Sequence, residues 1–227
     1  MNIALIVAAG SGTRLGGDRP KQFILVNDKP LMIYTIEAFN SNALIDAIVV
    51  VTNKDYIKQV NEWCRIYDLD KVKLVVAGGS TRQQSVYNGL MAAKSLCSNI
   101  NKDIVLIHDG ARPLVSDDII NNNIEGCRRH NATCTVIKTK DTIVKSSNNT
   151  TVDDVANRNE LYQVQTPQAF KLALILDAHQ RSSGNSATDD AQLVLSLGQE
   201  VYFVAGNSLN LKVTTEEDLS LFKALLK

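Results

Sequence analysis

An apolar, β-branched run near the start of the chain leads directly into a glycine-broken loop. Residues 3–8 read IALIVA, and residues 8–23 read AAGSGTRLGGDRPKQF. The first run is typical of a strand that is buried in a parallel sheet. Gly10 and Gly12 favour a sharp turn and leave backbone amides uncovered by side chains, and successive free amides bind anions. This start predicts an α/β sheet with an anion-binding loop after its first strand.

Two cations lie in the same loop. Arg14 and Lys21 supply positive charge, and Pro20 stiffens the chain before Lys21. A glycine turn alone could be only a tight connection between a strand and a helix, but two cations in one short loop favour phosphate binding. A dinucleotide fingerprint needs a third glycine where Leu15 stands, and a P-loop needs a Gly-Lys-Ser/Thr tripeptide that the sequence lacks. The loop therefore suits a nucleoside triphosphate held by a different turn.

Strand-like and helix-like runs alternate along most of the chain. Buried parallel strands are predicted at residues 48–52, 72–77 and 104–108. Helices are predicted at residues 56–67, after a capping box at 80–83, at 117–130 behind a Ser116 cap, and from residue 215 onward. The length of 227 residues predicts one domain over residues 1–227, and the alternation predicts a doubly wound, mostly parallel α/β sheet. Ligands of such sheets bind at the carboxyl ends of the strands.

One segment, residues 134–164, breaks the alternation. It holds short β-like pieces at 135–138, 142–145 and 161–165, with a polar turn at 146–151. The pattern indicates a hairpin or arm that leaves the main sheet. Because a lone hairpin is marginally stable in water, we expect the arm to pack on a second subunit.

The overall composition excludes several classes of protein. The formal net charge is zero, so no general attraction to nucleic acid or to an anionic membrane is predicted. No apolar run approaches the roughly 20 residues of a membrane span, and we expect no signal peptide because residue 2 already begins a strand. The four cysteines show no C-x-x-C spacing, so we expect structural thiols in a reduced, cytoplasmic protein.

Two further motifs directly follow predicted strands. In residues 76–86, VAGGSTRQQSV, backbone amides and hydroxyls around Gly79 and Ser85 could read a base and hold a ribose, although a glycine turn with a helix cap is an alternative. In residues 108–113, HDGARP, Asp109 is a candidate ligand for Mg²⁺, which prefers hard oxygen ligands shared with phosphates. The alternative for Asp109 is an ion pair with Arg112 that shapes the turn.

Two later segments are more ambiguous. Asp189 and Asp190 could bind substrate hydroxyls, but helix capping by Thr188 or Asp189 explains the same pattern. Lys212 lies in a strand-like run before the last helix, where it is either a solvated edge residue or a phosphate ligand.

Seven ordered motifs together resemble one family. AAGSGTRLGGDRPKQF, AGGSTRQQSV, IHDGARP, KDTI, VQTPQAF, TDDAQLV and NLKVTT have the order and spacing of 2-C-methyl-D-erythritol 4-phosphate cytidylyltransferases, from residue 2 to about residue 220. The resemblance implies transfer of CMP from CTP to a phosphorylated polyol with release of diphosphate, a step of non-mevalonate isoprenoid synthesis. It also implies a Rossmann-like sheet of the nucleotide-diphospho-sugar transferase type, flanked by helices, with a protruding β-arm and a homodimer.

The resemblance assigns roles by position. Arg14, Lys21 and Lys212 match the catalytic cations around the α-phosphorus, and Arg112, Thr142, Arg158, Thr166 and Thr188 match substrate-side positions. In the family, the arm residues Thr142 and Arg158 reach into the neighbouring subunit's site. The predicted nucleotide-binding residues are Ala8, Ala9, Gly10, Gly12, Gly79, Ser85 and Asp109; Gly12 is included as a glycine of the first loop. The chemistry needs positioned cations and Mg²⁺ rather than a nucleophilic triad, because the acceptor phosphate is already a nucleophile.

The acceptor and the activity have rivals. Residues 157–163, NRNELYQ, depart from the Asp-Arg-Ser-x-Leu-Trp pattern of methylerythritol enzymes and share Arg-Asn-x-x-Tyr-Gln with ribitol 5-phosphate cytidylyltransferases. The TRQQSV and TDDA motifs favour methylerythritol phosphate. A non-catalytic nucleotide-binding regulator on the same fold is a rival from another class, although a binding protein has no need of four charged residues around the reacting phosphate. An NAD-dependent enzyme is disfavoured by the absent third glycine.

Overall fold

The sheet at the centre of the molecule has seven strands. The computed structural model describes residues 1–10, 20–182 and 189–226. The strand order is β11-β7-β10-β6-β1-β4-β5. The strands are β1 (Asn2–Ala8), β4 (Ala47–Thr52), β5 (Val72–Ala77), β6 (Ile104–Asp109), β7 (Ala132–Lys138), β10 (Tyr162–Lys171) and β11 (Tyr202–Ala205).

Most neighbouring strands of this sheet are parallel. β1 pairs in parallel with β4 and β6, β4 with β5, and β11 with β7, whereas β10 is antiparallel to both β6 and β7. The predicted mostly parallel α/β sheet is therefore confirmed, with one reversed strand. The strand predictions at 48–52, 72–77 and 104–108 agree with β4, β5 and β6 to within one residue.

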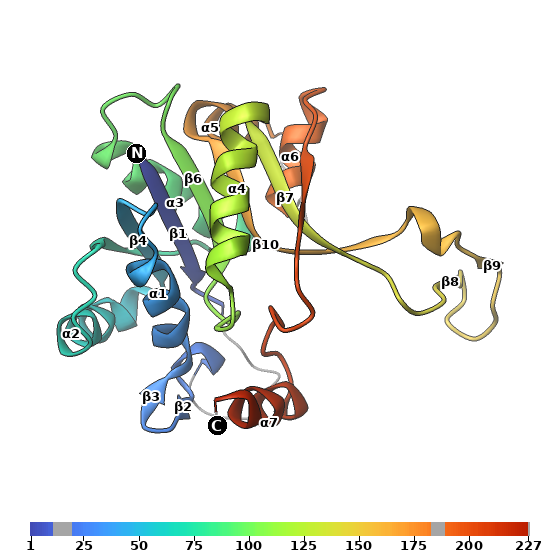
Figure 1. Cartoon of the computed structure of the whole chain (residues 1–227), viewed down its shortest axis with the longest axis horizontal. Helices are drawn as coiled ribbons and strands as arrows, with labels where there is room; N and C mark the ends of the chain where they lie inside the picture. Colours follow the sequence, from blue (N-terminus) through green and yellow to red (C-terminus); the bar gives the residue numbers. More distant parts are fainter. Residues whose placement is uncertain (11–19, 183–188, 227) are drawn as a thin grey trace.

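Helices cover both faces of the sheet (Figure 1). They are α1 (Leu31–Ser41), α2 (Ile57–Ile66), α3 (Arg82–Leu96), α4 (Asp117–His130), α5 (Leu172–Arg181), α6 (Asp190–Ser196) and α7 (Glu216–Leu225). Successive side chains of β1 point to opposite faces. Leu5 packs in the core cluster that contains α3 and α5, and Ile6 packs in the cluster that contains α1 and α4. A continuous apolar strand sequence is therefore needed to fill both layers.

The helix starts follow the predicted caps with one correction. The Ser116 and Thr215 caps are confirmed, and Thr215 forms a capping box with Asp218. The capping box predicted at 80–83 is wrong by one residue, because Thr81 is the cap and its hydroxyl accepts a hydrogen bond from the Gln84 amide at 3.0 Å. Helix α3 therefore begins at Arg82, and its first turn faces the carboxyl end of the sheet.

The segment between β7 and β10 extends away from the sheet as an arm (Figure 1). Residues 134–138 pair with β10 inside the main sheet. Beyond them, β8 (Val144–Lys145) and β9 (Asp154–Val155) form a two-stranded hairpin, followed by the 3₁₀ turn η4 (Arg158–Glu160). The strand predicted at 142–145 is thus shorter than expected.

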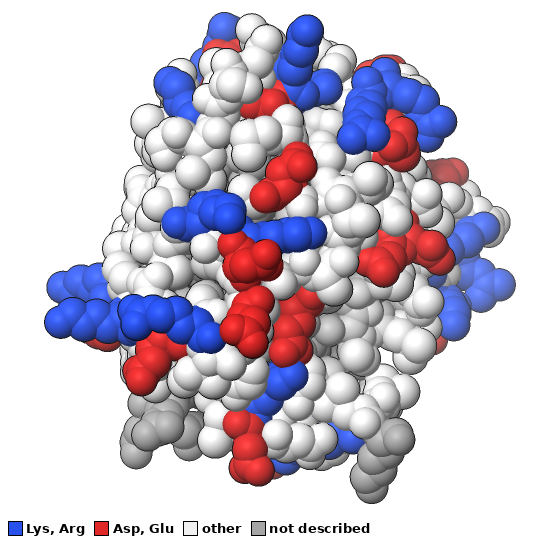
Figure 2. All heavy atoms as spheres, turned by 60° about the vertical axis from the view of Figure 1, so that its left-hand side comes forward, with Lys and Arg blue, Asp and Glu red and all other residues white. Residues whose placement is uncertain are grey.

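Charges of both signs are interspersed on the molecular face seen in Figure 2. This distribution accords with the formal net charge of zero over the whole sequence. Among the described helices, none combines the length and the apolar character that a membrane crossing requires.

Candidate active site

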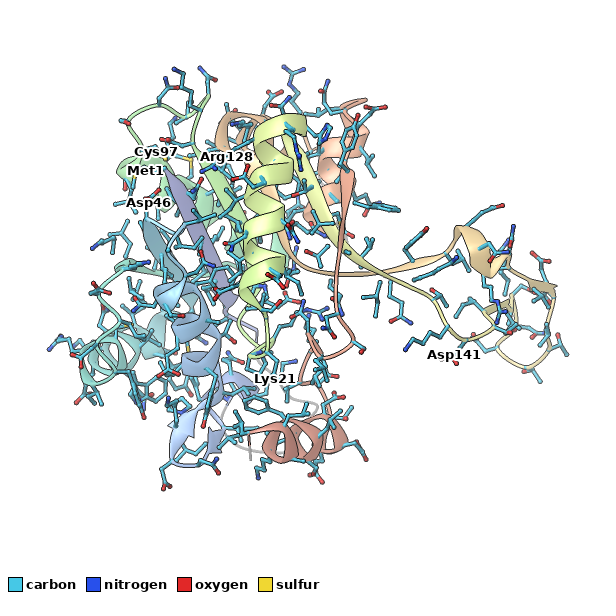
Figure 3. All side chains as sticks on the ribbon, viewed as in Figure 1. Met1, Lys21, Asp46, Cys97, Arg128 and Asp141 are labelled. Atoms are coloured by element: carbon cyan, nitrogen blue, oxygen red, sulfur yellow. The ribbon has the colours of Figure 1, made fainter. Side chains whose placement is uncertain are left out.

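A cavity of about 530 Å³ opens at the carboxyl ends of β1 and β6. Eight residues predicted from the sequence line it: Ala8, Ala9, Gly10, Lys21, Gly79, Ser85, Asp109 and Lys212. Lys21 belongs to the 3₁₀ turn η2 (Lys21–Phe23) and lies below the sheet in Figure 3, between the strand ends and α7. The fold thus gathers residues from four distant parts of the chain at the position expected for an α/β ligand site.

Gly10 stands at the described start of the first loop and lines the cavity. A Cβ atom at Gly10 would meet no atom within 4 Å, and Gly10 has no positive φ angle. Gly10 therefore leaves space beside the cavity; the sharp turn predicted for Gly10 and Gly12 runs into residues 11–19, outside the described residues, and stays a prediction. The Gln22 amide group donates hydrogen bonds to the carbonyl oxygens of Ala8 and Gly10, at 2.6 and 2.9 Å, and so ties the loop to η2.

A second glycine brings α3 close to this loop. A Cβ atom at Gly78 would lie 2.4 Å from the Ala9 Cβ and 2.9 Å from the Ser85 hydroxyl. The Ser85 hydroxyl accepts a hydrogen bond from the Gly79 amide at 3.0 Å and donates one to the Thr81 carbonyl at 2.8 Å. Ser85 therefore already shapes the turn that presents the Gly79 backbone to the cavity. Its predicted contact with a base stays a prediction.

Asp109 is the acidic centre of the cavity. Its Oδ2 atom lies 2.9 Å from the Lys212 Nζ atom and 3.5 Å from the Arg112 Nε atom. Burial acts to raise the pKa of Asp109, but the charges of Lys212, Arg82 and Arg112 outweigh it and hold this pKa well below its usual range. Asp109 is therefore ionised at any working pH. The ion pair with Arg112 that was the alternative reading exists, but the nearer cation is Lys212.

The loop after β6 is fastened from several sides. The Asp109 amide donates to the Thr166 hydroxyl at 3.1 Å, and the Arg112 Nη1 atom donates to the Asn210 carbonyl at 2.8 Å. Buried Asn210 donates in turn to the Thr166 carbonyl at 2.8 Å. Arg112 and Thr166 thus stand directly behind Asp109, outside the cavity lining, and they shape its position.

Lys212 reaches the cavity from an irregular segment. The strand predicted around it is wrong, because no strand is assigned between β11 and α7. The Val213 amide donates to the Ala111 carbonyl at 2.8 Å, which holds this segment against the loop after β6. Val213 and Phe222 are fully buried together with Val26 and Leu31, so α7 and the β2 (Leu25–Val26) region anchor Lys212.

Among the other predicted site residues that the structure describes, those on the arm do not reach this cavity. Thr142 and Arg158 are exposed on the arm, which extends away from Lys21 in Figure 3, where Asp141 is labelled on the arm. Gly12, Arg14 and Thr188 lie outside the described residues. Asp189 is the N-cap of α6, accepting from the Gln192 amide at 2.8 Å, so the capping reading applies to it.

The described cavity wall carries an excess of positive charge. Lys21, Arg82 and Lys212 are its cations, and Asp109 is its carboxylate. Arg82 and Gln22 also line the cavity and were not predicted as site residues, although both stand inside the VAGGSTRQQSV and AAGSGTRLGGDRPKQF motifs. Such a wall attracts a polyanion, and its fixed cations can stabilise charge that develops on a transferred phosphoryl group.

A family model now decides the classification, since the model of 2-C-methyl-D-erythritol 4-phosphate cytidylyltransferases matches residues 2–227. The chain belongs to this family. A cytidylyltransferase of that name from Clostridium acetobutylicum is 43% identical, covering 100% of this chain and 98% of that protein. The crystal structure of 4-diphosphocytidyl-2C-methyl-D-erythritol synthase from Anaerococcus prevotii is 31% identical with a TM-score of 0.83, covering 100% of this chain and 98% of that chain.

A third relative carries a different acceptor in its name. The ribitol-5-phosphate cytidylyltransferase of Vibrio parahaemolyticus is 39% identical, covering 100% of this chain and 96% of that protein. Both kinds of relative transfer a cytidylyl group, so this member of the cytidylyltransferase family is a nucleotidyltransferase.

Buried His108 makes stability of the cytidylyltransferase fold pH-dependent. Burial lowers the pKa of His108 from its ordinary value of 6.5 to about 4, and its Nε2 atom lies 3.1 Å from the Arg112 carbonyl oxygen. Between pH 6.5 and pH 4, His108 binds more protons in the unfolded chain than in the folded chain, so acidification through this range favours unfolding. We expect His108 to lower the free energy of unfolding by about 2 kcal/mol as the pH falls from 7 to 5. Urea unfolding of wild type and of His108→Gln at pH 7 and at pH 5 measures this loss of stability. An equal loss in the two proteins would contradict the role of His108.

Proposed function

We propose that this chain transfers CMP from CTP to 2-C-methyl-D-erythritol 4-phosphate, giving 4-diphosphocytidyl-2-C-methyl-D-erythritol and diphosphate. The observation that carries the proposal is the cavity in which Lys21, Lys212 and Asp109 converge, in a chain that the family model matches over residues 2–227. The methylerythritol relatives among the similar proteins support the acceptor.

The reaction follows from charge and position. An oxygen of the acceptor phosphate attacks the α-phosphorus of CTP, a new P–O bond forms, and the bond to the bridging β-oxygen breaks with its electron pair leaving on diphosphate. The acceptor phosphate is anionic at neutral pH, so no side chain need remove a proton. Lys21 and Lys212 neutralise charge that grows on the α-phosphoryl oxygens, and the family role of Arg14 is the same.

Mg²⁺ fits the donor set at Asp109. A magnesium site in a phosphoryl-transfer enzyme usually uses one or two carboxylates together with substrate phosphates. Asp109 supplies one ionised carboxylate in the cavity, and no cluster of three His, Cys, Asp or Glu side chains occurs in the described part of the chain. Asp109 would thus share the ion with the triphosphate, and the ion would neutralise phosphate charge.

Asp109→Asn should weaken magnesium dependence. The amide keeps the shape of the side chain but removes the charge that would hold the ion. We expect the apparent affinity for Mg²⁺ to fall by roughly 10-fold or more, with activity partly restored at high Mg²⁺. Magnesium titrations of turnover for this variant and for the exposed control Asp55→Asn provide the measurement. An unchanged titration combined with a lower melting temperature would leave Asp109 as a structural ion-pair partner only.

The arm supports a homodimer in which each subunit completes its partner's acceptor site. Ile143, Val144, Val152 and Val155 of the arm are between 41% and 63% exposed in the isolated chain. An arm with this much open apolar surface is stabilised when another surface covers it. Thr142 and Arg158, remote from their own cavity, would then bind the polyol phosphate in the partner's site.

The surroundings of the four cysteines support a cytoplasmic enzyme. All four thiols are free, and burial raises the pKa of Cys64 to about 11 and the pKa values of the other three to about 12. Thiols of this kind are structural and unreactive, as expected for a protein of a reducing compartment.

Two alternatives have definite signatures. Ribitol 5-phosphate as acceptor is favoured by the NRNELYQ segment at 157–163 and by the 39% identical ribitol enzyme. A non-catalytic nucleotide-binding regulator would bind CTP and release nothing. A coupled assay for diphosphate release, with CTP, Mg²⁺ and each acceptor alone, tests the proposal. We expect release that depends on methylerythritol phosphate; CTP binding without release under any condition would make the chain a regulator.

A further inference from the structure

Arg82 is a cation of the cavity wall that the family motifs did not assign. It is the first residue of α3, its side chain is 31% exposed, and it lines the same cavity as Lys21 and Lys212. It approaches Asp109 from the sheet face that α3 and α5 cover. Arg112 and Lys212 reach Asp109 from the loop after β6 and the segment before α7.

Arg82 is held from behind by a buried carboxylate. The Arg82 Nη2 atom donates to the Asp190 Oδ2 atom at 2.7 Å, and the Asp190 side chain is only 2% exposed. The other oxygen of Asp190, Oδ1, lies 3.4 Å from Nε2 of His179, which is itself buried. The Ala191 amide donates to the Gln168 side chain at 3.0 Å, which fixes the start of α6 against β10. Asp190 therefore offers a rigid anchor.

The position of Asp190 matters because a second carboxylate competes for the same cation. The charge of Arg82 is the second strongest of those that lower the pKa of Asp109, after Lys212. Burial acts to lower the pKa of Arg82, but the charges of Asp190 and Asp109 raise it. Arg82 thus lies in the field of two carboxylates, and its hydrogen bond is to Asp190, which holds it in the cavity wall.

We propose that Arg82 binds a phosphoryl group in this cavity and that Asp190 is the positioning residue that holds the guanidinium for it. A guanidinium carries five N–H donors in a fixed fork, so the hydrogen bond to Asp190 leaves donors for phosphate oxygens. The phosphoryl group belongs either to CTP or to the acceptor, because both ligands present anionic phosphate oxygens to a guanidinium. The inference rests on the proposed function only for the identity of these two ligands.

The test compares Arg82→Ala, Asp190→Asn and the double variant. The affinities for CTP with Mg²⁺ and for the acceptor phosphate are measured separately by calorimetry, together with kcat and both KM values. We expect each single variant to lose roughly 10- to 100-fold in binding one of the two ligands, the same ligand in both variants. The ligand that is affected identifies the source of the phosphoryl group. Because Asp190 acts through Arg82, Asp190→Asn should add no further loss in the Arg82→Ala background.

Controls separate positioning from folding. Asp177→Asn breaks the exposed ion pair between Asp177 and Arg181 on α5 and should change neither affinity. If Asp190→Asn fails to fold, Arg82→Lys replaces it, since a lysine keeps the charge without the fork and should still lose affinity for that ligand. Unchanged affinities in Arg82→Ala, or equal losses from Asp190→Asn with and without Arg82, would overturn the inference. Absence of diphosphate release by the wild type would instead refute the proposed function.

Discussion

Lys21→Ala lowers kcat by about 10²- to 10³-fold, or roughly 2.7–4 kcal/mol of barrier, with a much smaller rise in KM for CTP. The reason is the place of Lys21 in η2, at the edge of the cavity and next to Gln22, whose side chain ties η2 to Ala8 and Gly10. A cation fixed in this way is complementary to the charge of the transition state more than to that of bound CTP. Steady-state kinetics with both substrates varied provides the measurement.

Two matched variants make the result for Lys21 specific. Lys21→Arg keeps the charge and should retain more activity than the alanine variant. Lys58→Ala removes an exposed lysine of α2 that does not line the cavity, and it should leave kcat unchanged. Near-normal turnover of Lys21→Ala with only weaker CTP binding would reduce Lys21 to a ground-state ligand.

Arg158→Ala raises the KM for the polyol phosphate and leaves CTP binding nearly intact. An arginine grips a phosphate through two parallel hydrogen bonds, and each hydrogen bond to a charged group contributes about 1.5–3 kcal/mol, so we expect a rise of roughly 10- to 100-fold or more. Arg158 stands on the arm, away from the cavity of its own chain. Arg128→Ala on α4, which removes an exposed arginine outside the cavity, is the control.

Mixing of subunits tests whether Arg158 acts across a dimer. An Arg158→Ala chain and a Lys21→Ala chain, each nearly inactive alone, are combined under conditions of confirmed subunit exchange. If Arg158 serves the partner's site, a mixed dimer carries both lesions in one site and neither in the other. Random pairing then restores activity to about a quarter of wild type. No recovery would place Arg158 in its own subunit's site.

The sheet was the part of the fold that local sequence predicted best. Buried strands such as Ala47–Thr52 and Ile104–Asp109 are short apolar runs rich in β-branched residues, and their length and composition favour a strand over a buried helix. The reversal of β10 was not predicted, because the direction of a strand depends on where a distant neighbour pairs. The start of α3 was placed one residue early, since Ser80 and Thr81 are equally good caps in sequence.

The site was predicted where motifs carry the chemistry directly. Lys21, Asp109 and Lys212 were named from sequence, and the fold places them in one cavity. Their close partners could not be named, because the Asp109–Lys212 pair joins residues 103 positions apart in the chain. The anchor of Arg82 on Asp190 depends on the packing of α5 against both α3 and α6, which no local pattern records.

The most direct test of the proposed activity is a competition between the two acceptors in one reaction. Purified protein is incubated with CTP, Mg²⁺ and equal concentrations of 2-C-methyl-D-erythritol 4-phosphate and ribitol 5-phosphate, and the cytidine diphosphate products are quantified by mass spectrometry. We predict that 4-diphosphocytidyl-2-C-methyl-D-erythritol forms in large excess, with one diphosphate released per product. A predominance of CDP-ribitol, or no product while CTP binds, would contradict the account.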